Sequence, residues 1–365
     1  MTPENRTQHN SNKDVALPWA SSKTSILHVG IDLGTSRSAI ASSNGAREVM
    51  ASLVGWPKDS VSARVLGASI LVGDAVLENR LALHTCYPLN AGNLAFTELS
   101  GPEKDASRKA GVTLLDALRK ASNPRPDQAV CAVIGAPAEA TRENKQAIVD
   151  LARDAGIDGV MVVSEPFAVA YAVNALENAI VIDIGAGTID LCRMAGSLPG
   201  AEDQVTVFRA GNYVDQRLAE LIREAHPQVQ FTSNMIKLAK ERFSSVVDTE
   251  NRALVTFPVA GCPTKIDITP QLRSAVEELV PWITQGIQSL VATFDPEFQH
   301  RIRNKIIVSG GGSQVFGLQE ALEKGLEALG GGRVTIVEDP VYAGAQGALK
   351  LAQEMPEEYW SQMRR

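Results

Sequence analysis

The chain has 365 residues, longer than the roughly 100–200 residues of one typical domain, and this predicts two domains. Hydrophobic residues make up 44% and charged residues 21% of it, a balance that excludes an intrinsically disordered chain. The formal net charge of −7 argues against nucleic acid or anionic lipid as a bulk electrostatic partner. Direct membrane insertion is not expected, because the sequence contains no run of about 20 apolar residues.

The first 25 residues are polar and lack the apolar core of a secretory signal, so residues 1–25 are expected to form a disordered polar tail. The 4 cysteines and 5 histidines are scattered along the chain, with no CxxC pair and no metal-binding spacing. This usage is typical of reduced thiols in a cytoplasmic protein, with a distant disulfide as the alternative. No zinc site is expected.

Apolar runs of strand length alternate with amphipathic runs of helix length, which indicates an α/β fold. In the first half, strands are expected at 26–31, 37–42, 129–134 and 160–163, and helices at 106–121, 141–155 and from Pro166 onward. Thr141 is the expected N-cap of the second of these helices. In the second half, strands are expected at 179–184 and before Gly310, and helices at 233–243, 314–329 and 343–354.

Two segments of the chain repeat one pattern 151 residues apart. Each has an apolar strand, an aspartate, one apolar residue, a glycine turn and a returning strand. The first segment is Asp32-Leu-Gly34-Thr35-Ser36, and the second is Asp183-Ile-Gly185-Ala186-Gly187-Thr188. A repeat on this scale indicates a duplicated domain rather than a solenoid unit.

Such a turn leaves backbone N–H groups free at the bend, and glycine allows close approach, so the turn can bind phosphate oxygens. The aspartate before the bend can hold a hydrated Mg²⁺ ion. Two facing turns would therefore clamp a polyphosphate, with residues 32–36 as one jaw and residues 183–188 as the other. Either turn alone is also compatible with an ordinary hairpin. The matched carboxylates favour the clamp.

Two other nucleotide motifs are excluded. The dipeptide Gly-Lys of a Walker A loop does not occur, and neither Gly185-x-Gly187 nor Gly310-x-Gly312 has the third glycine of a dinucleotide fingerprint. A third glycine cluster ends a strand and is expected to open a helix, where bare backbone suits a flat base and an α-phosphate. Its residues are Gly310, Gly311, Gly312 and Ser313.

The order of these motifs resembles the ATPase superfamily of actins, heat-shock chaperones and sugar kinases. The resemblance spans residues 26–351 and rests on DLGTS, Gly135-Ala-Pro137, SEPFAVAYA, DIGAGTID, KERFSS and VSGGGS. Too little chain remains at the C-terminus for a chaperone substrate domain, so the size resembles bacterial actins of the MreB type. Residues 54–59, 201–205, 210–215 and 355–360 resemble the branch that forms filaments in magnetotactic bacteria.

The resemblance implies an actin-like ATPase fold with two duplicated ribonuclease H-like domains and a nucleotide cleft between them. Domain I is expected at 26–172 with a smaller subdomain at about 54–88, and domain II at 173–339 with a smaller subdomain at about 212–258. A C-terminal helix in 340–365 is expected to return to domain I. The implied function is an ATP-hydrolysing cytoskeletal protein whose filaments align magnetosomes in the cytoplasm.

The resemblance also assigns roles to residues. Glu165 is expected to orient the attacking water, assisted by Thr188, and Asp32 and Asp183 are expected to hold Mg²⁺ through its waters. The nucleoside end is assigned to Lys237, Lys240 and Glu241, which share one helix face, together with residues 310–313. A helix-stabilising Glu165 and a solvated charged face on residues 237–241 are the plainer alternatives.

Two departures and several alternatives accompany this interpretation. Thr188 is followed by Ile189, where family members commonly have a second threonine, which puts one hydroxyl contact and the hydrolysis rate in doubt. The loop at 123–127 and the polar N-terminus differ from those of membrane-bound relatives. A small-molecule kinase of the same fold and a nucleotide-binding scaffold that copolymerises with a paralogue remain alternatives. A magnetosome-associated adaptor is an expected partner.

Overall fold

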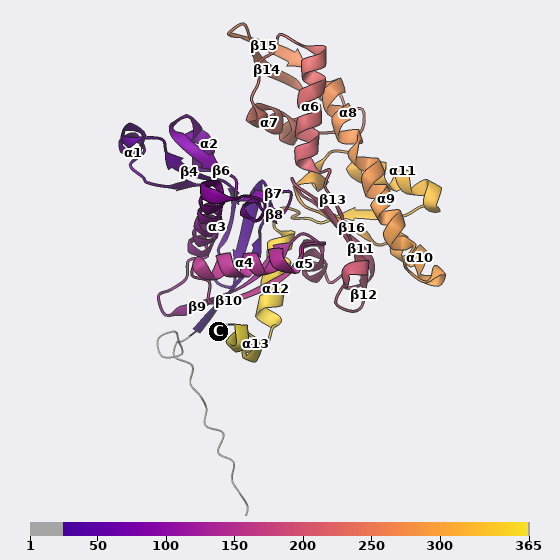
Figure 1. The fold of residues 1–365 in the computed structure, drawn as a ribbon. Coiled ribbons are helices and arrows are strands. Elements are labelled where there is room, and N and C mark those ends of the chain that lie inside the picture. Colours follow the sequence, from indigo (N-terminus) through magenta and orange to yellow (C-terminus); the bar gives the residue numbers. More distant parts are fainter. Residues whose placement is uncertain (1–24, 364–365) are drawn as a thin grey trace, which may run out of the picture.

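The computed structural model describes residues 25–363, so the expected tail lies outside the described residues except for Ser25, which begins the first strand. Figure 1 shows two arms above a common base. One arm carries α1 (Ser60–Leu66) and β4 (Val54–Pro57), and the other carries α7 (Ser233–Phe243) and β14 (Leu254–Val259). Two five-stranded sheets lie below them.

The first sheet has the order β10-β9-β1-β2-β3. Its first hairpin is antiparallel, and β1 is parallel to β9, which is parallel to β10. The bounds are β1 (Ser25–Asp32), β2 (Arg37–Ser42), β3 (Arg47–Ala51), β9 (Gln128–Ala136) and β10 (Gly159–Ser164). This sheet is the first copy of the duplicated unit.

Side chains that alternate along β9 bury both faces of this sheet. Val130, Ala132 and Ile134 pack into the core formed with α3 (Gly101–Ala121) and α4 (Arg142–Asp154). Cys131 and Val133 pack on the other side with α5 (Glu165–Ala172) and α12 (Ala343–Glu354). The continuous apolar run in the sequence is explained by this double burial.

The second sheet repeats the first, in the order β13-β12-β11-β16-β17. Again an antiparallel hairpin, here β11 with β12, lies beside strands that run parallel, here β16 and β17. The bounds are β11 (Glu177–Ile184), β12 (Ile189–Ala195), β13 (Gln204–Val207), β16 (Ile306–Ser309) and β17 (Val334–Ile336). The shared order confirms the predicted domain duplication.

Helices α5 and α12 form the base, between the two sheets. Cys131 of the first sheet and Val181 of the second belong to one apolar core with Ala348 of α12. The packing is too close for side chains at two points, because a Cβ on Gly347 would lie 1.7 Å from the carbonyl oxygen of Ala168, and one on Gly30 would lie 2.0 Å from that of Ala345. Backbone therefore meets backbone where α12 packs against α5 and β1.

The arms and the outer layer complete the chain. In the first arm they are β5 (Leu71–Val72), α2 (Asp74–Glu78) and β6 (Leu83–Cys86). In the second half they are α6 (Gly211–Ala225), β15 (Cys262–Asp267), α8 (Thr269–Glu277), α9 (Leu279–Val291), α10 (Pro296–Arg303) and α11 (Leu318–Leu326). β7 (Leu89–Asn90) and β8 (Asn93–Leu94) follow the first arm, and Leu89 and Leu94 pack in the core of the first sheet. After α12 the chain ends in α13 (Glu357–Met363), whose Trp360 is fully buried.

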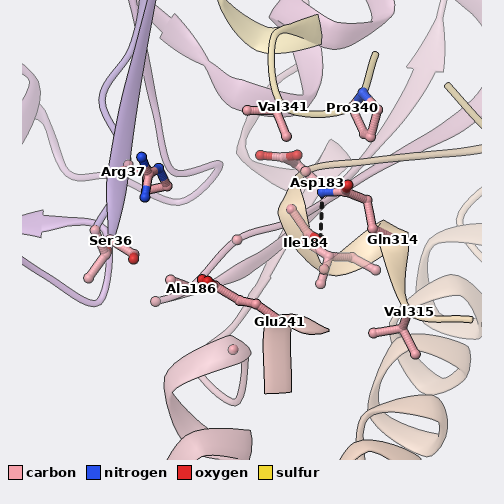
Figure 2. Close-up of a pocket in the computed structure, with 18 of the residues that line it drawn as sticks. Ser36, Arg37, Asp183, Ile184, Ala186, Glu241, Gln314, Val315, Pro340 and Val341 are labelled. Atoms are coloured by element: carbon pink, nitrogen blue, oxygen red, sulfur yellow. Dashed lines mark hydrogen bonds between the residues drawn. The ribbon is translucent and has the colours of Figure 1, made fainter. Parts of the chain in front are cut away.

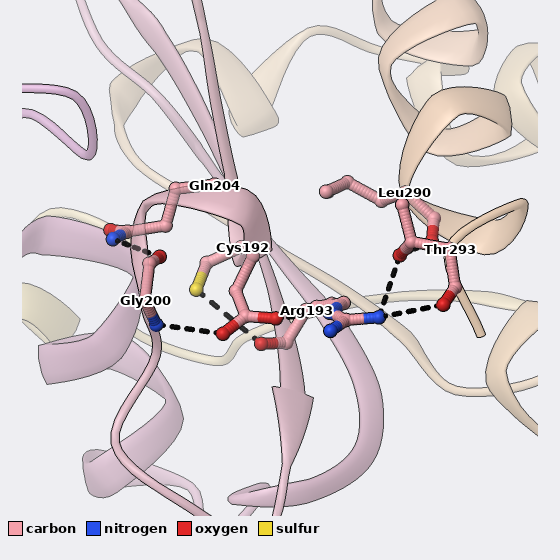
Figure 3. A network of polar contacts seen from close by, with 7 residues as sticks. Cys192, Arg193, Gly200, Gln204, Leu290 and Thr293 are labelled. Atoms are coloured by element: carbon pink, nitrogen blue, oxygen red, sulfur yellow. Dashed lines mark hydrogen bonds and ion pairs between the residues drawn. The ribbon is translucent and has the colours of Figure 1, made fainter.

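Arg193 on β12 ties the second sheet to the end of α9 (Figure 3). Its guanidinium donates to the carbonyl oxygen and the hydroxyl of Thr293, at 2.9 and 2.8 Å. It also pairs with Asp203, which in turn accepts a hydrogen bond of 2.7 Å from the backbone N–H of Gly200. The network therefore fixes the edge of the sheet.

The structure corrects some expected elements. The predicted helix at 314–329 is wrong at its start, because a 3₁₀ turn at Gly311–Gln314 is followed by extended Val315 and by Gly317 with a φ of 79°, so α11 begins at Leu318. α13 is an additional helix, whereas the Thr141 cap is confirmed by its bond of 3.2 Å from Asn144 N–H. None of the helices within residues 25–363 is long and apolar enough to cross a bilayer.

Candidate functional site: a cleft between the two glycine turns

A cavity of about 610 Å³ lies between the two halves of the molecule, within the range of small-molecule sites. Figure 2 shows Ser36 and Arg37 on one side of it, with Ala186, Glu241 and Gln314 facing them. Most of the residues predicted for the site line this cavity. They are Asp32, Gly34, Thr35, Ser36, Glu165, Asp183, Gly185, Ala186, Gly187, Thr188, Lys240, Glu241, Gly310, Gly311 and Gly312.

Hydrogen bonds from neighbouring segments fix the first turn. Thr35 Oγ1 accepts a hydrogen bond of 2.7 Å from the backbone N–H of Gly92, and Ser52 Oγ donates one of 2.6 Å to the carbonyl oxygen of Gly34. A Cβ on Gly34 would lie 2.4 Å from the carbonyl oxygen of Arg37, so only glycine fits this bend. The turn therefore has a fixed shape.

The second turn is held in the same way, and it reaches the first. Gly185 N–H donates to the carbonyl oxygen of Thr188 at 2.9 Å, and Asn212 N–H donates to that of Ala186 at 2.7 Å. A Cβ on Gly187 would lie 2.4 Å from Thr35 Oγ1. The two turns therefore face one another across a single cavity.

Carboxylates gather where the turns meet. Glu165 and Asp183 are 7% and 8% exposed, and Asp32 is partly buried beside them. Burial, followed by repulsion from Asp190, raises the pKa of Asp32 to about 6. Burial and the neighbouring carboxylates raise the pKa of Glu165 and of Asp183 well above their usual values. The carboxyl groups of the cleft therefore disfavour one another's charged forms, and a bound cation would stabilise those charges.

Asp190 is a fourth acidic residue that the sequence analysis did not single out. It is fully buried and lies directly opposite Asp183 in the β11–β12 pairing. Thr206 Oγ1 donates to its Oδ1 at 2.6 Å and the N–H of Ala138 donates at 2.8 Å. Burial still raises the pKa of Asp190 above its usual value. The last Asp of the DIGAGTID motif was the available signal, since the hairpin pairs it directly with Asp183, and residues paired across two strands share one face of the sheet.

The donors fit a hydrated divalent cation. Asp32 and Asp183 line one cavity, and neither carboxylate nor that of Glu165 forms an ion pair with Lys or Arg within residues 25–363. Oxygen donors with uncompensated charge suit Mg²⁺, which keeps several of its waters. Within residues 25–363, no group of three or more His, Cys, Asp or Glu is placed to hold a metal ion.

At the opposite end, α7 contributes Lys240 and Glu241 to the cavity. Lys240 Nζ donates to the carbonyl oxygen of Gly211 at 2.8 Å and lies 2.9 Å from Asp215. Two predicted residues do not line the cavity. Lys237 turns instead toward Ser36, and fully buried Ser313 donates to the carbonyl oxygen of Gly310 at 2.7 Å.

The third glycine cluster has a different local structure from the one predicted, although Gly310, Gly311 and Gly312 do line the cavity. It forms a 3₁₀ turn rather than a helix N-terminus, so no helix dipole points at the cavity from residues 310–313. Gly310 has a φ of 81°, and a Cβ on it would lie 2.5 Å from Asp183 Oδ1. This glycine therefore leaves room for the carboxylate.

Further lining residues gave no motif signal in the sequence. Arg37 lies beside the first turn and pairs with Asp74 at 2.9 Å. An apolar wall is formed by residues from separate segments of the chain, which only the fold brings together. They are Val214, Val276, Leu279, Val315, Phe316 and Val341.

Duplicated sheets around a cleft with two facing turns define an actin-like fold, and the chain belongs to the MreB/Mbl family, whose profile matches residues 27–359. Actin-like protein MamK of Paramagnetospirillum magneticum is 41% identical over 337 residues, which are 92% of this chain and 95% of that protein. The predicted resemblance is thereby confirmed.

Two solved structures agree with this assignment. A MamK double helical filament is 41% identical, covers 90% of this chain and 99% of its own, and has a TM-score of 0.86. A non-polymerising MamK mutant bound to AMPPNP has the same identity and coverage and a TM-score of 0.68. The first of these proteins is a filament, and the second holds an ATP analogue.

Proposed function

We propose that the chain binds Mg-ATP in the cavity, hydrolyses it, and polymerises with copies of itself into cytoplasmic filaments that align magnetosomes. The observation that carries this proposal is the approach of the two turns, where a Cβ on Gly187 would lie 2.4 Å from Thr35 Oγ1. Backbone N–H groups from both halves then surround one polyphosphate. The MamK relatives, one a filament and one bound to AMPPNP, support the same proposal.

In this proposal each residue has a defined task. The turns at 32–36 and 183–188 bind the phosphates, while Asp32 and Asp183 orient the waters around Mg²⁺, which supplies positive charge to the phosphate oxygens. Lys240, Glu241 and Gly310–Gly312 enclose the nucleoside. If the domains are residues 26–172, 173–339 and 340–365, as we propose, the two turns belong to different domains, so bound nucleotide would favour cleft closure.

Glu165 is the proposed residue for water activation. It begins α5 and packs over β9, where a Cβ on Gly135 would lie 3.2 Å from its Cγ. Its buried carboxyl faces the same cavity as Asp183 and Thr188. A carboxylate in this place accepts a hydrogen bond from water and orients it toward the terminal phosphate, with Thr188 as a second partner.

Phosphate release and filament formation together test the proposal. Glu165→Gln should lower phosphate release by about 10²-fold or more while ATP-dependent filaments still form, measured by a phosphate assay, sedimentation and negative-stain microscopy. Glu139→Gln is the matched control, because this carboxyl lies outside the cavity. Normal phosphate release from Glu165→Gln would remove Glu165 from the mechanism. ADP formation that requires an added acceptor would instead identify a kinase.

Position in the cell is tested separately. A fluorescent fusion of the chain should form lines beside the magnetosomes. Variants that no longer bind ATP should not form these lines. A diffuse signal for the unaltered chain would contradict the filament function in the cell. Capture of a magnetosome-surface protein by the assembled filament would identify the proposed adaptor.

A further inference from the structure

Lys237 spans the cleft between the second arm and the first turn. It lies on α7, and its Nζ donates a hydrogen bond to Ser36 Oγ, 201 residues away in sequence. Ser36 lies in the turn between β1 and β2 and lines the cavity. The bond therefore joins the two parts of the molecule that a closing cleft would bring together.

The positively charged side chains around the bond between Lys237 and Ser36 differ in how close their acidic partners lie. Arg37 lies 2.9 Å from Asp74, and Lys240 lies 2.9 Å from Asp215. The carboxylate nearest to Lys237 in the described pairs is that of Glu241, at 3.9 Å. Burial, together with Lys240 and Arg37, lowers the pKa of Lys237. Lys237 thus directs a poorly compensated positive charge at the first turn.

The chemistry of the bond leaves Ser36 able to bind an anion. An ammonium group has donors and no acceptor, so the Ser36 oxygen must accept from Lys237. The hydroxyl proton of Ser36 stays free to donate into the cavity. A hydrogen bond from a charged donor also polarises the hydroxyl and strengthens that donation.

We propose that Lys237 acts through Ser36 as a positioning residue for the polyphosphate, and so couples phosphate binding to closure of the cleft. This inference rests on the proposed nucleotide function and extends it. It replaces the nucleoside contact that the sequence predicted for Lys237, because Lys237 reaches the first turn instead of lining the cavity. Lys240, one helical turn further, stays on the second half through Gly211 and Asp215.

Nucleotides with different numbers of phosphates distinguish a role of Lys237 in phosphate positioning from a contact to the nucleoside. Affinities for Mg-ATP, Mg-ADP and AMP are measured by calorimetry for the native chain, Lys237→Met and Lys237→Arg. Lys237→Met should weaken ATP binding about tenfold, as expected for loss of one charge-assisted hydrogen bond, and leave AMP unchanged. Lys237→Arg should restore most of the ATP affinity. An equal loss for all three nucleotides would overturn the proposal in favour of a nucleoside contact.

A double-mutant cycle tests whether Lys237 acts through Ser36. Ser36→Ala combined with Lys237→Met should bind ATP about as well as the weaker single variant, whereas independent losses that multiply would overturn the proposal. The same cycle on urea unfolding of the nucleotide-free protein measures the bond without any ligand. Coupling there, with no ATP binding by the native chain, would refute the proposed function and leave the bond established.

Discussion

The two hairpins that form the cleft have the same backbone and different chemistry. In each, an aspartate at or next to the end of the first strand pairs with the residue seven positions later, Asp32 with Ala39 and Asp183 with Asp190. A methyl group therefore stands in the first hairpin where a carboxylate stands in the second. Duplication has preserved the register of the strands and not the charge.

The polar groups around the two hairpins differ in the same way as the residues paired with the two aspartates. Beside the first turn, buried Ser38 and Ser52 form a neutral hydroxyl pair at 2.8 Å. Beside the second, Asp190 is held by Thr206 and by the N–H of Ala138. Only the second hairpin thus carries donors for an extra buried carboxylate, and its half of the cleft has the greater density of charge.

Giving the first hairpin the charge of the second should have the largest effect. Ala39 is 3% exposed and packs with Ala41 and Ala345, so Ala39→Asp would bury a carboxylate opposite Asp32 without donors. We expect a loss of about 3–5 kcal/mol in the free energy of unfolding at pH 7.5, measured with urea. Ala39→Ser is the control for size, and equal losses in the two variants would show that charge is not the cause.

An intermediate effect is expected from pH, through Asp32. Because its pKa is about 6 in the folded chain and 3.8 is the ordinary value, the folded state keeps this proton to higher pH. The contribution to stability is present below about pH 4 and lost as the pH rises through about 6. Asp32→Asn should therefore be more stable than the native chain at pH 7.5, by about 3 kcal/mol, with nucleotide absent and EDTA present.

The measurement is urea unfolding of both proteins between pH 4.5 and 7.5. The advantage of Asp32→Asn should grow across this range. Asp105→Asn, on the exposed side of α3, is the control and should show no such trend. A difference that stays constant with pH would contradict the raised pKa of Asp32.

The smallest effect compares the two supporting bonds. Thr206→Val removes the hydroxyl that donates to buried Asp190, and we expect a loss of about 2 kcal/mol in unfolding free energy. Ser38→Ala removes one member of the neutral pair, for which about 1 kcal/mol is expected. Thermal unfolding of the two variants decides between them. Equal losses in the two variants would mean that a hydrogen bond to the buried carboxyl of Asp190 stabilises the fold no more than the neutral bond between Ser38 and Ser52 does.

Much of the site could be predicted from the sequence because short-range patterns encode it. The apolar strand, aspartate and glycine of each turn lie within a few residues, so Asp32, Gly34, Asp183 and Gly185 were all found, and they line one cavity. The duplication of the domain followed from the repeat of this pattern, whereas the actin-like fold came from the resemblance of the motif order to a known superfamily. These patterns can be recognised in the sequence because the geometry of a tight turn depends mainly on residues that are neighbours in the chain.

Features that depend on distant contacts were not predictable in this way. The helix expected at 314–329 begins late because Phe316 N–H bonds to the carbonyl oxygen of Ser244, a contact across 72 positions of sequence. The reach of Lys237 to Ser36 likewise depends on the placement of α7 against the first turn. Side-chain periodicity shows which face of a helix is polar and does not show what that face meets.

The junction of α12 with β1 has a consequence for biosynthesis. Backbone of the first strand, at Gly30, touches backbone near Ala345, so the opening strand of the chain cannot complete its burial until almost the last helix has been made. Most of the polypeptide must leave the ribosome before that face of the first sheet is covered. Truncations before residue 352 should accordingly yield nascent chains that depend on chaperones.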